Sequence, residues 1–192
     1  MVPLNTFTPS AVVSAYLPPL TDDYDPLTMR APGGVAIGDG SQGRETQFWT
    51  VSYNAATDVI SVTPASTGSP FTLTVADVLS VCLAFDNNMA VALAYMKADG
   101  AYLYFFNGLH NAYETLQVPG ATSCRVCVDK TTSFYNAGSD VIFAYTLGGT
   151  VSYRQQRDRY AIAYDVGPAS GVLTRVGPSA GNRLQLEIQP SA

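Results

Sequence analysis

The feature that most constrains the fold is a series of short runs rich in Val, Ile, Thr, Tyr and Phe, which begins at Thr46. Asn, Asp and Gly separate the runs, and this order is typical of β-strands joined by hairpins. Apolar spacing of the helical kind is nearly absent. We therefore predict an all-β fold of antiparallel hairpins. The predicted strands cover residues 47–53, 59–63, 71–75, 81–85, 91–96, 101–106, 115–118, 125–128, 141–146 and 150–155, with a further pair at 160–164 and 184–188.

Three segments repeat the order strand, tight turn, strand when aligned on Tyr53, Tyr95 and Tyr145: WTVSYNAATDVISV, VALAYMKADGAYLYFF and VIFAYTLGGTVSYRQQ. The second and third follow strands that end in aspartate, VCLAFD at Asp86 and CRVCVD at Asp129, about 43 residues apart. This period suits a propeller blade of three or four strands, although hairpins of unrelated all-β proteins also look alike. Closing a propeller takes at least about four blades. We therefore expect a sandwich, an open stack of propeller-like blades or one sector of a multi-chain ring.

Residues 1–45 differ in composition from the rest of the chain. Six prolines fall within the first 32 residues, and a glycine-rich stretch runs from Gly33 to Gly43. We predict an extended arm over residues 1–45, followed by a β domain over residues 46–192. Such an arm is either a disordered leader or a strand added to a neighbour's sheet edge. Apolar residues in the arm, including Tyr16 and Leu17, favour docking on a neighbour.

The composition indicates contact with other proteins. Charged residues make up 13% of the 192, against about 25% in typical soluble domains. The chain has 12 tyrosines and only two lysines, a bias that matches the cores of protein interfaces. The alternative is an ordinary β domain whose surface is covered by Thr, Ser, Asn and Gln. A net charge of −5 argues against general nucleic-acid binding, which needs clustered Lys and Arg.

Neither a membrane span nor a signal peptide is expected, because no apolar run is long enough and no basic segment opens the chain. The three cysteines are Cys82, Cys124 and Cys127. Positions three apart on a strand point to opposite faces, so the CxxC spacing of the last two does not favour zinc or redox chemistry. We predict buried thiols in a reducing cytoplasm, and no cofactor.

The inventory of catalytic groups is poor. The single histidine, His110, lies in a loop of Asn and Gly residues, and no nucleophile elbow, zinc-binding helix motif or phosphate loop is present. Asp86, Asp99, Asp129 and Asp140 allow a glycosidase pair only in a weak sense. An aspartate repeated at the end of a strand is more typical of a turn or cap that accepts backbone N–H groups. We therefore predict a protein that is not an enzyme.

The densest charge is the segment RQQRDR at residues 154–159. Its arginines suit bidentate pairs with carboxylates or phosphate, and structural ion pairing is favoured over a ligand site. If the segment is extended, Arg157 and Arg159 share one face with Asp158 opposite, which suits a contact between subunits.

The order VCLAFDNNMAVALAY, AYLYFFNG, SDVIFAYTLGGTVSYRQQRDRYAIAY and NRLQLEI resembles tail proteins of short-tailed double-stranded DNA bacteriophages, a strand-rich family of tail tube, nozzle or fibre-attachment components. The likeness covers roughly residues 81–188, and its most specific piece is YRQQRDRY with the closing NRLQLEI. It implies a virion component present in several symmetric copies, without catalytic residues. The chain has too few units to match larger nozzle-like relatives, which suggests an accessory subunit.

The resulting hypothesis is a tail-associated structural protein, assembled in the host bacterial cytoplasm, that forms a homo-oligomer and contacts other phage tail proteins. One alternative is a glycan-binding module of the virion that uses Trp49 and exposed tyrosines such as Tyr113. Another is an enzyme that degrades surface polymer through paired aspartates such as Asp86. The predicted contact residues are Tyr153, Arg154, Arg157, Asp158, Arg159, Tyr160, Tyr16 and Leu17.

Overall fold

A computed structural model describes residues 35–37, 46–64, 69–86, 90–129, 140–178 and 184–190, with side chains described from Trp49 onward. In these ranges the fold consists of β-strands and one short 3₁₀ turn, Gln156–Asp158. The strands are β1 (Val35–Ile37), β2 (Thr46–Asn54), β3 (Val59–Pro64), β4 (Phe71–Thr74), β5 (Ser80–Phe85), β6 (Val91–Lys97), β7 (Gly100–Asn107), β8 (Ala112–Pro119), β9 (Ser123–Val128), β10 (Val141–Leu147), β11 (Thr150–Gln155), β12 (Tyr164–Pro168), β13 (Val172–Pro178) and β14 (Leu184–Gln189).

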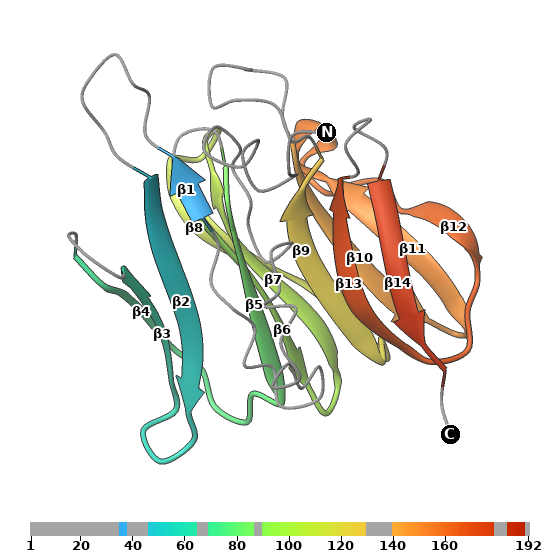
Figure 1. Ribbon diagram of the computed structural model, residues 1–192, viewed down its shortest axis with the longest axis horizontal. Helices are drawn as coiled ribbons and strands as arrows, with labels where there is room; N and C mark the ends of the chain where they lie inside the picture. The colour runs from blue at the N-terminus through green and yellow to red at the C-terminus, as the bar shows by residue number, and fades with distance from the viewer. Residues whose placement is uncertain are drawn as a thin grey trace, which may run out of the picture.

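Each sheet consists of strands that are consecutive in the chain (Figure 1). Three sheets have four strands each, β1–β4, β5–β8 and β9–β12, and the fourth is the pair β13–β14. Every pairing is antiparallel. In the second and third sheets the hairpins close at equivalent places, since Lys97 pairs with Gly100 and Leu147 pairs with Thr150. The prediction of an all-β antiparallel fold is confirmed.

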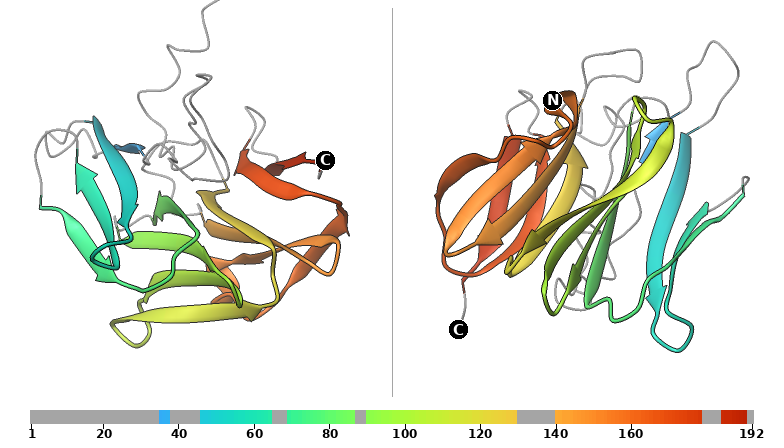
Figure 2. Two further views of the ribbon diagram at one scale, coloured as in Figure 1. Left: turned by 90° about the horizontal axis from the view of Figure 1, so that it is seen from below. Right: turned by 180° about the vertical axis from the view of Figure 1, so that it is seen from behind.

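The sheets stack one after another like propeller blades. Strand β5 lies against β2, β9 lies against β5 and β6, and β13 lies against β9 and β10. Seen from below, the four sheets follow one another along an arc (Figure 2). Of the architectures expected from the sequence, the described residues form the open stack of blades.

The tyrosine repeat corresponds to a structural repeat. Tyr53, Tyr95 and Tyr145 lie on β2, β6 and β10, the second strand of each four-stranded sheet. Tyr95 pairs with Val81 and Tyr145 pairs with Cys124, which hold the same place in the two aligned first strands. The aligned segments are therefore equivalent parts of successive sheets.

Burial distinguishes the inner strands of the stack from its ends. Nearly every residue of β5, β6, β9 and β10 is buried, because each of these strands has a neighbouring sheet on both faces. In β4 and β14, half-buried and exposed residues alternate instead. The exposed positions of the first sheet include Thr50, Ser52, Thr63, Thr72 and Thr74. The stack thus ends on polar faces, as the terminal repeats of other stacked proteins do.

Each of the ten main predicted strands overlaps an observed one, with ends within three residues. The strand predicted at 160–164 is wrong, because Arg159 and Tyr160 have left-handed backbone angles and β12 begins only at Tyr164. The strand predicted at 184–188 is β14, but its partner is β13, which the sequence reading missed.

One strand of the first sheet lies before the boundary predicted at residue 45. Within the range assigned to the arm, β1 pairs with β2 and so belongs to the first sheet. Tyr16 and Leu17 lie outside the described residues. No helix in the described ranges is both long enough and apolar enough to cross a membrane.

Candidate functional site

The candidate site is built around the turn that joins β11 to β12. Gln156–Asp158 form one 3₁₀ turn, and the N–H of Arg159 donates to the carbonyl of Gln156 at 2.8 Å. Arg159 (φ 56°) and Tyr160 (φ 59°) are both left-handed, a conformation that costs about 1–3 kcal/mol at a non-glycine residue. The alternation predicted for an extended segment is therefore wrong, since a 3₁₀ turn does not place its residues on alternate faces.

Two residues from the predicted contact set hold this turn in place. Nη1 of Arg154 donates to the carbonyls of Tyr160, at 2.6 Å, and Ala161, at 3.3 Å. The ring of Tyr160 is only 2% exposed and packs edge-on against Phe105, with ring centroids 4.7 Å apart. Burial raises the pKa of the Tyr160 phenol. Arg154 and Tyr160 thus hold the turn in place through contacts within this chain.

Arg157 connects the residue that follows β9 with the residue that precedes β10. Its Nη2 donates to Asp129 Oδ2 at 3.0 Å, and its Nε donates to Asp140. Burial raises the pKa of Asp140, and the hydrogen bond from Arg157 opposes that rise. The prediction of structural ion pairing is confirmed for Arg157. Its side chain is 58% exposed, so this pairing contributes little to stability.

The repeated aspartates act as caps, as predicted. Asp86 Oδ1 accepts the N–H of Ala90 at 2.8 Å, and Asp129 Oδ1 accepts the N–H of Asp140 at the same distance. In each case the aspartate ends the first strand of a sheet and binds the residue just before the second strand. Gln156 connects the two sheets, because its Nε2 donates to Asp86 Oδ2 at 3.3 Å.

We expect Asp129→Ala to lower the free energy of unfolding by about 1–2 kcal/mol, because it leaves the N–H of Asp140 without its acceptor. Asp129→Asn keeps an oxygen at the same place and is expected to cost less than half as much. Urea unfolding followed by tryptophan fluorescence gives both values. Equal losses for the two variants would show that the charge, rather than the cap, is what matters.

Asp158 and Tyr153 also belong to the predicted set. Asp158 Oδ2 accepts the hydroxyl of Tyr164 at 2.8 Å, which raises the pKa of that tyrosine. Asp158 Oδ1 is buried and has no hydrogen-bond partner among the described residues. The rings of Tyr153 and Tyr164 stack with centroids 5.2 Å apart. These contacts bind the start of β12 to β11 and to the turn.

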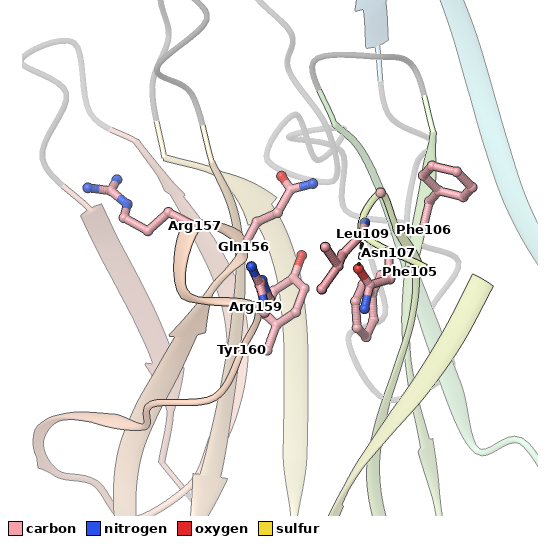
Figure 3. A pocket seen from close by; sticks show the side chains of 9 residues that line it. Phe105, Phe106, Asn107, Leu109, Gln156, Arg157, Arg159 and Tyr160 are labelled. Carbon is pink, nitrogen blue, oxygen red and sulfur yellow. Dashed lines mark hydrogen bonds between the residues drawn. The ribbon is translucent and has the colours of Figure 1, made fainter. Parts of the chain in front are cut away.

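A hollow lies beside the turn, between the second and third sheets (Figure 3). On one side it is lined by Gln156, Arg159 and Tyr160, and on the other by Phe105, Asn107 and Leu109 at the end of β7 and in the following turn. Arg157 also borders the hollow but points away from it (Figure 3). The guanidinium of Arg159 makes no hydrogen bond or ion pair with the described residues. The hollow therefore combines an available guanidinium with apolar and amide groups.

The cysteines and the histidine do not line the hollow, and their contacts are structural. Cys124 belongs to the main core cluster and Cys127 to the smaller cluster under β13, so the two point to opposite faces of β9 as predicted. All three cysteines are buried and free, and burial raises each thiol pKa. His110 is exposed in the β7–β8 turn, where its Nδ1 contacts Glu114.

The sequence singled out the residues of this segment but not their turn, and it did not indicate the opposite wall of the hollow. Asn107 and Leu109 lie about 50 residues earlier in the chain than Arg159, and only the stacking of two sheets brings them together. No local pattern marks that contact. Comparison with known proteins found no matching family model, no matching curated protein and no matching solved structure.

Proposed function

We propose that this protein is a structural component of a tailed bacteriophage particle, which assembles into the tail by protein–protein contacts and performs no catalysis. The sequence resemblance over residues 81–188 supports the phage tail, and the high tyrosine and low lysine content supports assembly through protein interfaces. The proposed partners are further copies of this chain and other tail proteins.

The observation that carries the proposal is that aspartates at the strand ends are already engaged in contacts within the chain. Asp86 and Asp129 are occupied as caps, and Asp140 is occupied by Arg157. These are three of the four aspartates that the sequence offered for an acid–base pair, and the fourth, Asp99, accepts the hydroxyl of Tyr102 at 2.7 Å. A stack of sheets whose repeated carboxylates hold its own loops suits a rigid building block better than a reaction centre.

The direct test is made on particles of the phage that encodes this chain. We expect mass spectrometry of purified particles to detect the chain in several copies, and antibody labelling in the electron microscope to mark the tail. Particles without the chain would contradict the proposal, and so would labelling confined to the capsid.

A second candidate function is glycan binding, and one cluster of aromatic rings favours it. Tyr104 and Tyr113 stack with centroids 4.8 Å apart and nearly parallel planes, flanked by Phe71 and Phe106. Tyr113 is 36% exposed, so its ring is available to stack on a sugar. Trp49 suits this role less well, because it packs against Phe85 at 5.4 Å between the first two sheets.

If the particle reads a host glycan through this cluster, Tyr113→Ala should reduce binding to host surface polysaccharide at least tenfold. Tyr102→Ala, which removes a half-buried ring of the same sheet stacked on Tyr95, should leave it unchanged. Isothermal titration calorimetry measures both. Equal binding by the two variants would argue against the aromatic cluster as a glycan site.

A further inference from the structure

Arg159 differs from the other arginines in the described part of the chain. Arg125, Arg154, Arg157 and Arg175 are each held by backbone carbonyls or by carboxylates. The guanidinium of Arg159 has no such partner in the part of the chain that the structure describes. Among the described arginines it is therefore the one whose charge remains available to another molecule.

The backbone presents Arg159 at the rim of the hollow in a fixed way. The N–H of Tyr160 donates to the carbonyl of Gln155 at 2.8 Å, and Arg154 holds the carbonyl of Tyr160. The buried ring of Tyr160 anchors the turn from below. A side chain on such an anchored turn loses less conformational freedom on binding than one on a loose loop.

The opposite wall of the hollow supplies an apolar surface. Leu109 is 62% exposed, although it is a large apolar residue, and the ring of Phe105 on the same wall packs against Tyr160. In the close view Leu109 lies across from the Arg159–Tyr160 turn (Figure 3). A cation next to an apolar wall suits a peptide that carries carboxylates together with an aromatic side chain.

The chain itself contains such a peptide. Its densest acidic stretch is Asp22-Asp23-Tyr24-Asp25, which lies outside the described residues. Three carboxylates surround one aromatic ring there, and no basic residue occurs between Met1 and Met29. The strongest negative segment of the sequence thus complements its strongest positive one, which contains Arg159.

We propose that the hollow beside Arg159 is the docking site for the acidic segment Asp22–Asp25 of a second copy of this chain. This inference rests on the proposed function, because it supplies the contact through which the copies assemble. Arg159 pairs with a carboxylate of the segment, and Tyr24 packs against Leu109. In a closed symmetric oligomer the same contact recurs in every subunit, so a weak contact adds up to a stable assembly.

Charge reversal in two separate full-length variants tests whether the acidic segment of one copy binds the hollow of another. The first is Arg159→Asp, a substitution that suits the left-handed conformation at this position because Asp adopts it more readily than most residues. The second combines Asp22→Arg, Asp23→Arg and Asp25→Arg. Light scattering measures the mass of the unmodified chain, of each variant and of an equal mixture of the two variants. Lys97→Asp, at the β6–β7 hairpin, is the control.

We expect an oligomer for the unmodified chain and for Lys97→Asp, the mass of a single chain for each of the two test variants, and recovery of the oligomer in their mixture. Recovery requires the segment of one copy to reach the hollow of another. An oligomer that persists in Arg159→Asp, or a mixture that stays monomeric, would overturn the docking site while leaving assembly by other contacts intact. A monomeric unmodified chain would overturn the docking site and count against self-assembly as well.

Discussion

Replacing Gly100 with alanine is expected to lower the free energy of unfolding by about 3 kcal/mol or more. Gly100 has a φ of +146°, which side chains rarely adopt. A Cβ at this position would lie 2.4 Å from the carbonyl oxygen of Val118 and 3.0 Å from the nitrogen of Gly120. Both are backbone atoms of the second sheet and its exit turn, so relief requires the β7–β8 pairing to shift. Urea denaturation followed by circular dichroism measures the loss.

Gly108→Ala is the matched control in the turn at the other end of β7. A Cβ there would meet no atom within 4 Å, so the free energy of unfolding should change by less than about 0.5 kcal/mol. Similar losses for the two alanine variants would contradict the close approach of β7 and β8 at Gly100.

Phe143→Ala is expected to lower the free energy of unfolding by about 3–5 kcal/mol, because it removes a large side chain and leaves a cavity. Phe143 is 0% exposed and lies on β10 within the main core cluster. That strand is buried along almost its whole length, since the third sheet has packed neighbours on both faces. The surrounding sheets cannot collapse onto the space without breaking their own pairings.

Leu147→Ala on the same strand provides the comparison. Leu147 is 40% exposed at the β10–β11 hairpin, so its truncation should cost less than about 1 kcal/mol. Guanidinium unfolding of both variants yields the difference. If Phe143→Ala were as mild as Leu147→Ala, the double-sided burial of the third sheet would be incorrect.

How much of the fold follows from the sequence depends on whether the determining contacts are local. The inner strands are recognisable because runs such as VCLAF and VALAY are apolar along their length. The caps at Asp86 and Asp129 are recognisable because the acceptor and its N–H partner lie close in the chain or across one loop. Strand β13 was missed because Gly171 precedes it and Gly177 and Pro178 end it, residues that are typical of turns.

The conformation of the segment after β11, in contrast, could not be predicted from its own sequence. The alternation in YAIAY predicts a strand, but Tyr160 turns into the core and Ile162 remains exposed. The deciding interaction is the buried packing of Tyr160 on Phe105, 55 residues earlier in the chain and in another sheet. Such a contact depends on how sheets stack, which no periodicity within one strand encodes. The same holds for the hollow beside Arg159.

The mass of the unmodified chain in solution, measured by light scattering over a wide range of concentrations, tests the central claim most directly. A protein that acts by assembling should form one discrete oligomer whose mass is a whole multiple of the single chain. A single-chain mass at every concentration, together with no binding to any other protein of the particle, would contradict assembly as its function.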